Sequence, residues 1–519
     1  MNALVLTGTG VGVGDVAAVA RDGRKVEIGP DAIGRLEKAR KVLNQAAASG
    51  QQIYGLNTGL GANLGTAVEG DAGAFQRQLL EGRSGAVGEA LPVETVRATM
   101  VARTAMLSVG GSGISPAVFV TLVDALNAGV HPVMPSLGSI GAGDLVLMTA
   151  LARMLTGEGD AEYQGRRMPA AKALMMARLA PISLAPKDGL SLINASAVSA
   201  GSGALAVTDA LSALAQQQQA GALTMEGFGA NRTILDPRLH MARPAAGQQE
   251  AAKALHDLLA GNEAPAPTTL QDPLSIRCMP SIHGALIEAI GQARHAVEIE
   301  LNAAADNPLV LGDDGLVLST GNFHTASMAL AFETLGLAIA QCAAASAARF
   351  IQLTGPGRNG LPKYLSPVGG ASAGFVPLQK TVTSILAAIR HKANPVMLDF
   401  LPVSEGVEDH ATQTPLAVAK CAGMIALWRR LIAFELMAAA QAIDLRDGLA
   451  LAPRTAAIHT AIRALVPVLK EDRPLGIDAE ALCAALANGR GRRPYDWPTL
   501  SRNSFNSAGS IRTMCLSSG

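Results

Sequence analysis

Five segments of this chain combine the apolar spacing of helices with lengths above those of ordinary globular helices. They are rich in alanine and leucine and cover residues 198–226, 281–304, 325–353, 376–394 and 414–445. Alanine is the best helix former, and small side chains let helices approach closely. A helix that is apolar over most of its surface must be buried. The chain is therefore predicted to be all-α, a bundle of long, mostly buried helices.

Shorter patterns precede the bundle. Residues 1–30 alternate short apolar runs with Gly and Asp, which predicts a small α/β-like region of strands and turns. Helical spacing covers 31–48, a Gly- and Asn-rich loop follows over 50–66, and helical patterns resume from about 70 to 128. The composition changes near the end and favours a loosely ordered tail. The predicted segments are an N-terminal region (1–227), the central long-helix bundle with the C-terminal helices (228–485) and the tail (486–519).

Composition excludes several classes of partner. The 519 residues include 42 basic and 42 acidic ones, so no charge excess points to nucleic acid or a membrane surface. We expect no signal peptide and find no uninterrupted apolar run of transmembrane length. Charged residues are only 16% of the chain, which leaves little to cover a large surface and predicts a homo-oligomer. Five scattered cysteines without a CxxC pair predict a reduced, cytoplasmic protein.

Two glycine-rich segments are candidate binding loops. The first runs from Gly8 to Gly14, but no clear βαβ unit or partner acid is recognised around it, so a turn is favoured over a nucleotide loop. The second, Tyr54-Gly-Leu-Asn-Thr-Gly-Leu-Gly61, contains a phenol. Tyrosine becomes a base only where cations or hydrogen-bond donors stabilise the phenolate. From the residues alone, packing of Tyr54 at the base of a loop is favoured over catalysis.

Two further segments carry charged groups. In Gln271-Asp-Pro-Leu-Ser-Ile-Arg277-Cys-Met-Pro, the arginine can hold a carboxylate through two parallel hydrogen bonds. The run Glu408-Asp409-His410 suggests metal ligands. Its acids are adjacent to the histidine rather than three or four residues away, which disfavours ligation, so we predict no metal and a buried hydrogen-bond network instead.

These segments, in this order, resemble the motifs of the aromatic amino-acid ammonia-lyase family, which includes histidine and phenylalanine ammonia-lyases. Further matches are Gly189–Asn194, Leu301–Pro308, Gly321–His324 and Gly360–Leu365. The resemblance implies the family's long-helix fold and a homotetramer whose active sites combine residues from three subunits. It implies an acid/base role on a mobile lid for Tyr54, binding of the substrate carboxylate by Arg277 and a substrate contact for Asn194. It also places three other residues in the substrate site: Gln271, Asn307 and Phe323.

One family motif is a residue short. The segment Gly138-Ser-Ile-Gly-Ala142-Gly143-Asp144-Leu resembles the signature Gly-Ser-Val-Gly-Ala-Ser-Gly-Asp-Leu. In the family, Ala-Ser-Gly cyclises into an electrophilic 4-methylideneimidazolone (MIO), whose exocyclic carbon comes from the serine. Here Gly143 follows Ala142 directly, so we expect no ring and no organic cofactor. Leu274 replaces a second family tyrosine, which leaves Tyr54 as the expected proton acceptor.

The missing electrophile points to a particular substrate class. MIO assists loss of ammonia from free amino acids, whereas a quaternary ammonium has no lone pair to attack it and leaves as a neutral amine. The departure resembles the ergothionase branch of the family, which eliminates trimethylamine from the betaine ergothioneine to give thiourocanate. Lys380 lies on an otherwise apolar helix and needs a partner, so we predict a pair with Glu408 that hydrogen-bonds the thiourea-like ring. Arg83 is predicted either to stabilise the thione sulfur or to pair with Glu81.

Two alternatives stay open. The first is a MIO-type histidine or aromatic amino-acid ammonia-lyase, or an aminomutase, in which the serine is absent only from the sequence as recorded. The second is an inactive paralogue that acts as a binding subunit. Retention of Tyr54, Arg277, Asn194 and Glu408 argues against the second, because an inactive site has no reason to keep all four.

Overall fold

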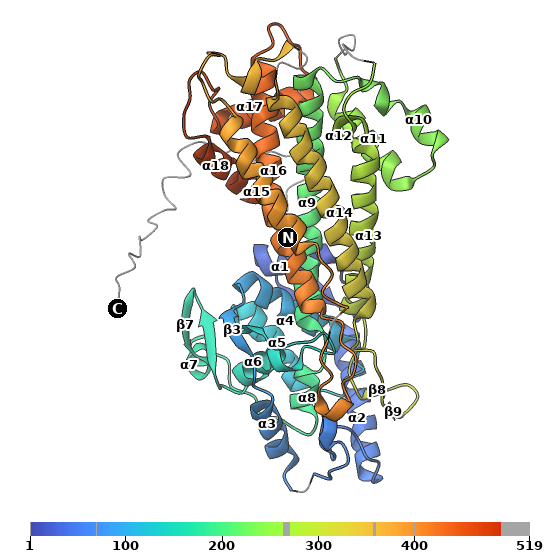
Figure 1. The fold of residues 1–519 in the computed structure, drawn as a ribbon. Helices are drawn as coiled ribbons and strands as arrows, with labels where there is room; N and C mark the ends of the chain where they lie inside the picture. The colour runs from blue at the N-terminus through green and yellow to red at the C-terminus, as the bar shows by residue number, and fades with distance from the viewer. Residues whose placement is uncertain (1, 69, 263–269, 357–359, 399, 489–519) are drawn as a thin grey trace. The chain divides into compact units, whose positions relative to one another are not determined.

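The computed structural model describes residues 2–68, 70–262, 270–356, 360–398 and 400–488 (Figure 1). The helices are α1 (Val13–Asp22), α2 (Pro30–Ala48), α3 (Ala72–Gly82), α4 (Val93–Ser108), α5 (Pro116–Ala128), α6 (Leu145–Leu155), α7 (Ala170–Met176), α8 (Asp188–Ile193), α9 (Ala197–Phe228), α10 (Pro237–Ala242), α11 (Ala246–Leu259), α12 (Leu274–Arg277), α13 (Met279–Leu301), α14 (Ala326–Thr354), α15 (Val376–Lys392), α16 (Thr414–Asp444), α17 (Pro453–Leu465) and α18 (Leu475–Asn488). The strands are β1 (Leu4–Leu6), β2 (Val26–Ile28), β3 (Val87–Ala90), β4 (Val130–Pro132), β5 (Pro135–Leu137), β6 (Asp160–Tyr163), β7 (Arg166–Pro169), β8 (Leu309–Leu311) and β9 (Leu316–Leu318). Long helices with few, short strands confirm the predicted fold class.

The five predicted long helices are α9, α13, α14, α15 and α16, and each begins and ends within three residues of its expected bounds. Small residues allow close helix contacts. On α9, a Cβ built at Gly201 would lie 2.5 Å from the carbonyl carbon of Ala98 on α4, so any side chain there would push the two helices apart.

The chain forms two compact units that interleave along the sequence. The first unit consists of 1–209, 289–336 and 393–423, and the second of 210–288, 337–392 and 424–519. Four of the five boundaries fall inside α9, α13, α14 and α16, and the fifth lies at the end of α15. The predicted segments 1–227 and 228–485 instead follow the chain in order, and residues 489–519 of the predicted tail lie outside the described part.

The first unit contains all the described strands. β1 and β2 pair in parallel, with α1 between them, so the βαβ unit that we did not recognise from the sequence is present. The other strands form an antiparallel sheet β4-β6-β7, a β3-β5 pair and a β8-β9 hairpin. Strand β3 interrupts the stretch from about 70 to 128 that was predicted to be helical. For residues 1–30 we predicted strands and turns, and the strands β1 and β2 are present. The ten-residue helix α1 between them was not predicted.

The glycine loop of this βαβ unit is already filled by protein groups. The amide of Gly12 donates to Asp15 Oδ2 at 3.0 Å, and the amide of Val11 donates to Asn302 Oδ1 at 2.9 Å. The carboxylate of Glu298 lies 3.4 Å from the amide of Val13. A phosphate would have to displace these acceptors and approach two carboxylates. This occupancy argues against a nucleotide site more directly than the sequence did.

The second unit has a polar centre within its helical core. Glu435 on α16 and Arg349 on α14 form a fully buried ion pair, with Arg349 Nε 2.6 Å from Glu435 Oε1. The carboxylate also accepts from Gln217 and Thr224 on α9 and from Ser346 on α14. Removing one member would leave a buried charge unsatisfied, so the network fixes the register of the three helices.

Two segments, Asp188–Phe228 and Ala326–Thr354, have the length and hydropathy of membrane spans. Their most apolar windows are 94% and 61% buried inside the chain, as the core helices of a folded protein are. The lower figure belongs to α14, one face of which is uncovered in the single chain.

Candidate active site

A cavity of about 630 Å³ opens in the first unit, where the Tyr54 loop meets the segments that follow α13 and α15. Its lining combines polar and apolar residues and includes four of the predicted site residues: Tyr54, Asn307, Phe323 and Glu408. Ala142 of the shortened motif also lines it, together with His324, Asp409 and His410. Segments far apart in the sequence therefore supply one site.

The Tyr54 loop is held by its own side chains and by α3. The Asn57 side chain accepts from the amide of Ile53 at 2.7 Å and donates to the carbonyl of Gln51 at 2.8 Å. Gln76, fully buried on α3, donates to the carbonyl of Gly55 and accepts from the amide of Leu190, both at 3.0 Å. This amide ties the loop to α8. Sequence reasoning missed it, although a polar residue on the buried face of an amphipathic helix is a usable signal.

Tyr54 lies in a mixed electrostatic environment. Burial raises the pKa of its phenol, and the nearby carboxylate of Glu408 acts in the same direction. The amide of Gly61, which donates to the phenol oxygen at 2.9 Å, and the guanidinium of Arg83 oppose this rise in the pKa. Both stabilise the phenolate, as a catalytic base requires.

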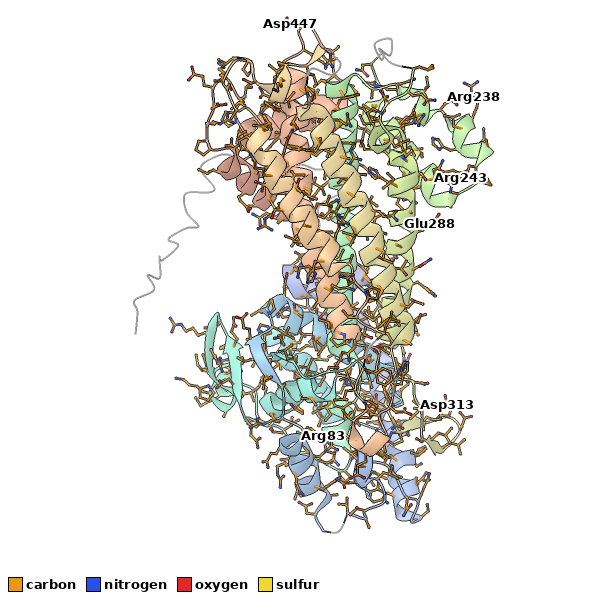
Figure 2. All side chains as sticks on the ribbon, viewed as in Figure 1. Arg83, Arg238, Arg243, Glu288, Asp313 and Asp447 are labelled. Atoms are coloured by element: carbon orange, nitrogen blue, oxygen red, sulfur yellow. The ribbon has the colours of Figure 1, made fainter. Side chains whose placement is uncertain are left out.

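Arg83 follows the last residue of α3 (Figure 2). Burial lowers the pKa of its guanidinium, and interactions with Tyr54 and with the carboxylate of Glu408 oppose this effect. Among the described residues it forms no ion pair with Glu81, whose carbonyl only caps the Arg83 amide. Arg83 is not among the described residues that line the cavity, so its predicted contact with the thione sulfur stays a prediction. Glu408 also accepts from the hydroxyl of Ser404 at 2.7 Å.

The shortened motif is anchored on both sides. Asp144, fully buried, accepts from Ser139 Oγ at 2.7 Å and from the amide of Ser199 at 2.9 Å. Burial raises the pKa of this carboxyl, and the hydrogen bonds oppose the rise. The carbonyl of Gly141 accepts from Thr412 Oγ1 at 2.8 Å, and Ala142 forms a β-bridge with His324. The motif thus keeps a fixed structure without the serine.

The residues present do not fit an MIO ring. No serine separates Ala142 from Gly143, so no residue can supply the exocyclic carbon. Gly143 has a left-handed φ of +75°, and a Cβ built on it would lie 2.7 Å from Leu145 Cδ1. A serine at that position would be strained as well as out of register.

We expect the purified protein to have the intact mass of its unmodified chain. Ring formation removes two waters from an Ala-Ser-Gly sequence, and this chain has no such sequence between Gly141 and Asp144. Intact-mass spectrometry checks the prediction. A deficit of two waters, mapped to the peptide that carries Gly138–Leu145, would contradict it.

Asn194 and Phe323 flank the shortened motif. A Cβ built on Gly143 would lie 3.6 Å from Asn194 Oδ1 and 4.0 Å from Phe323 Cβ. Asn194, which follows the last residue of α8, is buried and donates to the carbonyl of Asn307 at 2.5 Å. Asn194 itself is not among the described lining residues, but this bond places its amide behind the cavity wall.

Three predicted site residues belong to the second unit. Arg277 ends α12 and is half-buried, whereas Gln271 and Lys380 are exposed. None of them is among the described residues that line the cavity. Lys380 lies on α15, which buries only Leu378, Val382 and Ile389 in the single chain, so its expected burial is not met there. Its pairing with Glu408 stays a prediction.

Two histidines add proton chemistry that the sequence did not predict. His324 Nε2 lies 3.0 Å from His410 Nδ1, so one of the two nitrogens carries the proton that they share. Burial, followed by the charge of His410, lowers the pKa of His324. Both residues stood in motifs that the sequence pointed to, but only the fold brings them together. Among the described residues no group of three or more His, Cys, Asp or Glu side chains could hold a metal.

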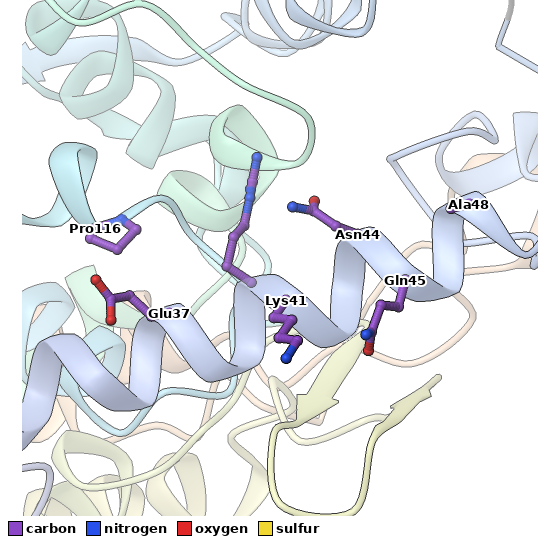
Figure 3. Close-up of a pocket in the computed structure, with 7 residues that line it drawn as sticks. Glu37, Lys41, Asn44, Gln45, Ala48 and Pro116 are labelled. Atoms are coloured by element: carbon purple, nitrogen blue, oxygen red, sulfur yellow. The ribbon is translucent and has the colours of Figure 1, made fainter.

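A second cavity, of about 460 Å³, lies along α2 (Figure 3). Glu37, Lys41, Asn44 and Gln45 line it from the helix, and Pro116 faces them. These polar side chains are exposed and share no residue with the first cavity. The first cavity is therefore the candidate active site.

Comparison with known proteins identifies the family of the chain. A family model described as aromatic amino acid lyase matches residues 11–464. The chain belongs to the aromatic amino acid lyase family. A histidine ammonia-lyase of Treponema denticola is 36% identical over 490 residues, which are 93% of this chain and 97% of that protein. The predicted family and the predicted enzyme class, a carbon–nitrogen lyase, are confirmed.

Two solved structures of the family cover most of the chain. Ergothionase from Treponema denticola, in complex with desmethyl-ergothioneine sulfonic acid, superposes with a TM-score of 0.90 at 33% identity, over 94% of this chain and 99% of that one. Histidine ammonia-lyase from Trypanosoma cruzi superposes with a TM-score of 0.87 at 30% identity, over 94% and 93%. The chain is thus similar both to ammonia-lyases and to an ergothionase.

Proposed function

We propose that this lyase works without MIO and releases trimethylamine from ergothioneine to give thiourocanate. The observation that carries the proposal is the missing serine between Ala142 and Gly143, in a site that keeps Tyr54 beside Arg83 and Glu408. A fold that has lost the electrophile but kept the proton acceptor suits a substrate whose leaving group needs no activation. The similarity to an ergothionase supports the same substrate class.

In the proposed reaction the Tyr54 phenolate takes the proton from the β-carbon. The C–H electron pair becomes the new double bond, the C–N bond breaks, and its electron pair leaves on neutral trimethylamine. The permanent positive charge of the substrate favours the phenolate, and it adds to the effect of Arg83. Arg277 and Asn194 hold the carboxylate, while Lys380 and Glu408 bind the thiourea-like ring.

We also propose a homotetramer with shared active sites, as the family resemblance implies, in which other subunits supply Arg277, Gln271 and Lys380, none of which is among the described residues that line the cavity. An uncovered face of α14 supports assembly. Exposed or half-exposed residues recur along this helix at alternating steps of three and four: Ser327, Leu330, Thr334, Leu337, Gln341, Ala344, Ala348 and Ile351. Such spacing is the seam of a helical bundle. We also propose a cytoplasmic location, which the four described cysteines, all free, support.

The test is to incubate the pure protein with ergothioneine, histidine and phenylalanine in parallel. We expect trimethylamine and thiourocanate from ergothioneine, and no urocanate or cinnamate, because no electrophile is available to activate an amine. Measurement of trimethylamine together with the product absorbance distinguishes the three. Efficient release of ammonia from histidine, without trimethylamine from ergothioneine, would overturn the proposal.

A histidine ammonia-lyase is the second candidate, because the 36% identical relative carries that name. MIO-dependent ammonia release would require the serine that this chain lacks. The mass measurement and the substrate test therefore decide between the two candidates independently.

A further inference from the structure

A cluster of buried charges lies next to the cavity, behind Asn307. Arg103 on α4 and Lys187, just before α8, are fully buried, and Asp306 is 1% exposed. Arg40 and Asp188 extend the cluster, with Arg40 Nη1 3.2 Å from Asp188 Oδ1. Three cations thus share two carboxylates in the interior of the first unit.

Arg103 joins two segments that carry site residues. Its Nη2 donates to Asp306 Oδ1 at 3.0 Å and also to the carbonyl of Ser191. Ser191 lies three residues before Asn194, and Asp306 immediately precedes Asn307. The side chain of Asn194 then donates to the carbonyl of Asn307 at 2.5 Å. One guanidinium therefore fixes both ends of the contact between the two asparagines.

Lys187 fixes the beginning of α8, the short helix that contains Ser191. Its Nζ donates to the carbonyl of Ser112 and lies 3.4 Å from Ser191 Oγ. Its φ of +67° is left-handed, a conformation that a residue other than glycine keeps only when its surroundings enforce it. Burial lowers the pKa of Lys187 to about 8, and the charge of Asp306 opposes this effect. Helix α8 is thus anchored before its first turn and again at Ser191.

Stability does not explain Arg103. A buried ion pair is often no more stabilising than apolar side chains of the same volume. In addition, Nε and Nη1 of Arg103 have no hydrogen-bond partner among the described residues, which is unfavourable for a buried guanidinium. What Arg103 offers here is reach: the Nη2 group at the end of its long side chain donates to Asp306 and to the carbonyl of Ser191 at once.

We propose that Arg103 is a positioning residue: it sets the orientation of Asn194 relative to Asn307 and thereby shapes the side of the cavity that receives the substrate carboxylate. The inference rests on the proposed function in one respect only, namely that the group bound on this side of the cavity is the substrate carboxylate. It holds for any amino-acid or betaine substrate of this site.

The test is Arg103→Lys, which keeps the charge but has a shorter side chain, so its ammonium does not reach the position of Nη2 between Asp306 and Ser191. Arg97→Lys is the matched control: it lies on the same helix and donates to the carbonyls of Val19, Ala20 and Leu126, away from the site. We expect Arg103→Lys to lower kcat/KM about 10²-fold, the loss that a misplacement of about 1 Å causes. Arg97→Lys should keep wild-type kcat/KM at a comparable loss in Tm.

Hydrogen exchange without substrate gives a second readout. Peptides covering 190–194 and 305–309 should exchange faster in Arg103→Lys than in Arg97→Lys. Asp306→Asn, which keeps one oxygen acceptor, should also increase the exchange rate of these two peptides. It replaces Arg103→Lys as the test variant if Arg103→Lys does not fold. Wild-type activity on ergothioneine tests the proposed function separately. Equal exchange and equal kcat/KM in Arg103→Lys and Arg97→Lys would reduce Arg103 to a structural residue.

Discussion

Replacing Tyr54 with phenylalanine is expected to lower kcat on ergothioneine by about 10²–10⁴-fold, the usual contribution of general base catalysis. Substrate binding should change little, because the ring that lines the cavity remains. Steady-state kinetics under conditions where chemistry limits the rate measures both effects. The matched control is Tyr163→Phe on β6, outside the described cavity lining, which should leave kcat unchanged.

The pH dependence of kcat/KM should also change in Tyr54→Phe. Burial raises the pKa of Tyr54, so the phenolate fraction is small at neutral pH and grows as the pH increases. The wild-type kcat/KM should therefore increase with pH, and Tyr54→Phe should lose this dependence. A variant that keeps more than about half the wild-type rate, with an unchanged pH profile, would place the base elsewhere.

Lys380→Met should reduce kcat/KM for ergothioneine by about 10- to 10²-fold, the effect of one lost hydrogen bond from a charged group. Glu408 keeps the hydroxyl of Ser404 and the nearby charge of Arg83. The loss of stability should thus be smaller than the roughly 3–5 kcal/mol of an unpaired buried charge. Lys392→Met, an exposed lysine on the same helix, is the control.

The double variant Lys380→Met/Glu408→Gln distinguishes ring recognition from a structural pair. If the pair binds the thiourea-like ring, the double variant should regain stability and stay inactive on ergothioneine. Recovery of Tm and kcat/KM together would show that the pair only stabilises the protein. Thermal unfolding and trimethylamine release, measured on the same preparations, provide both quantities.

The long helices were predictable because periodicity and small residues act locally. Helix α1 and strand β3 were not predicted, because each is short and a short apolar pattern fits a helix and a strand equally well. The interleaving of the two units was beyond sequence reasoning. It depends on contacts between distant segments, which no local pattern encodes.

The site was predictable where a motif resemblance supplied roles, as for Tyr54 and Glu408, which line one cavity. The resemblance could not supply neighbours. The electrostatic link of Arg83 to Tyr54 and the shared proton of His324 and His410 depend on loop paths that only the folded chain defines. The buried bridge made by Gln76 was invisible for the same reason.

The anchoring of Gly141 bears on how far this motif is from one that could form the ring. No single substitution creates Ala-Ser-Gly directly before Asp144; alanine at 141 and serine at 142 are both needed. Gly141 has a φ of +83°, and a Cβ built there would lie 2.1 Å from Thr412 Oγ1. Alanine at 141 would therefore collide with Thr412, whose hydroxyl donates to the carbonyl of Gly141. In whichever order the two substitutions are made, an Ala-Ser-Gly tripeptide at this place also requires a compensating change around Thr412.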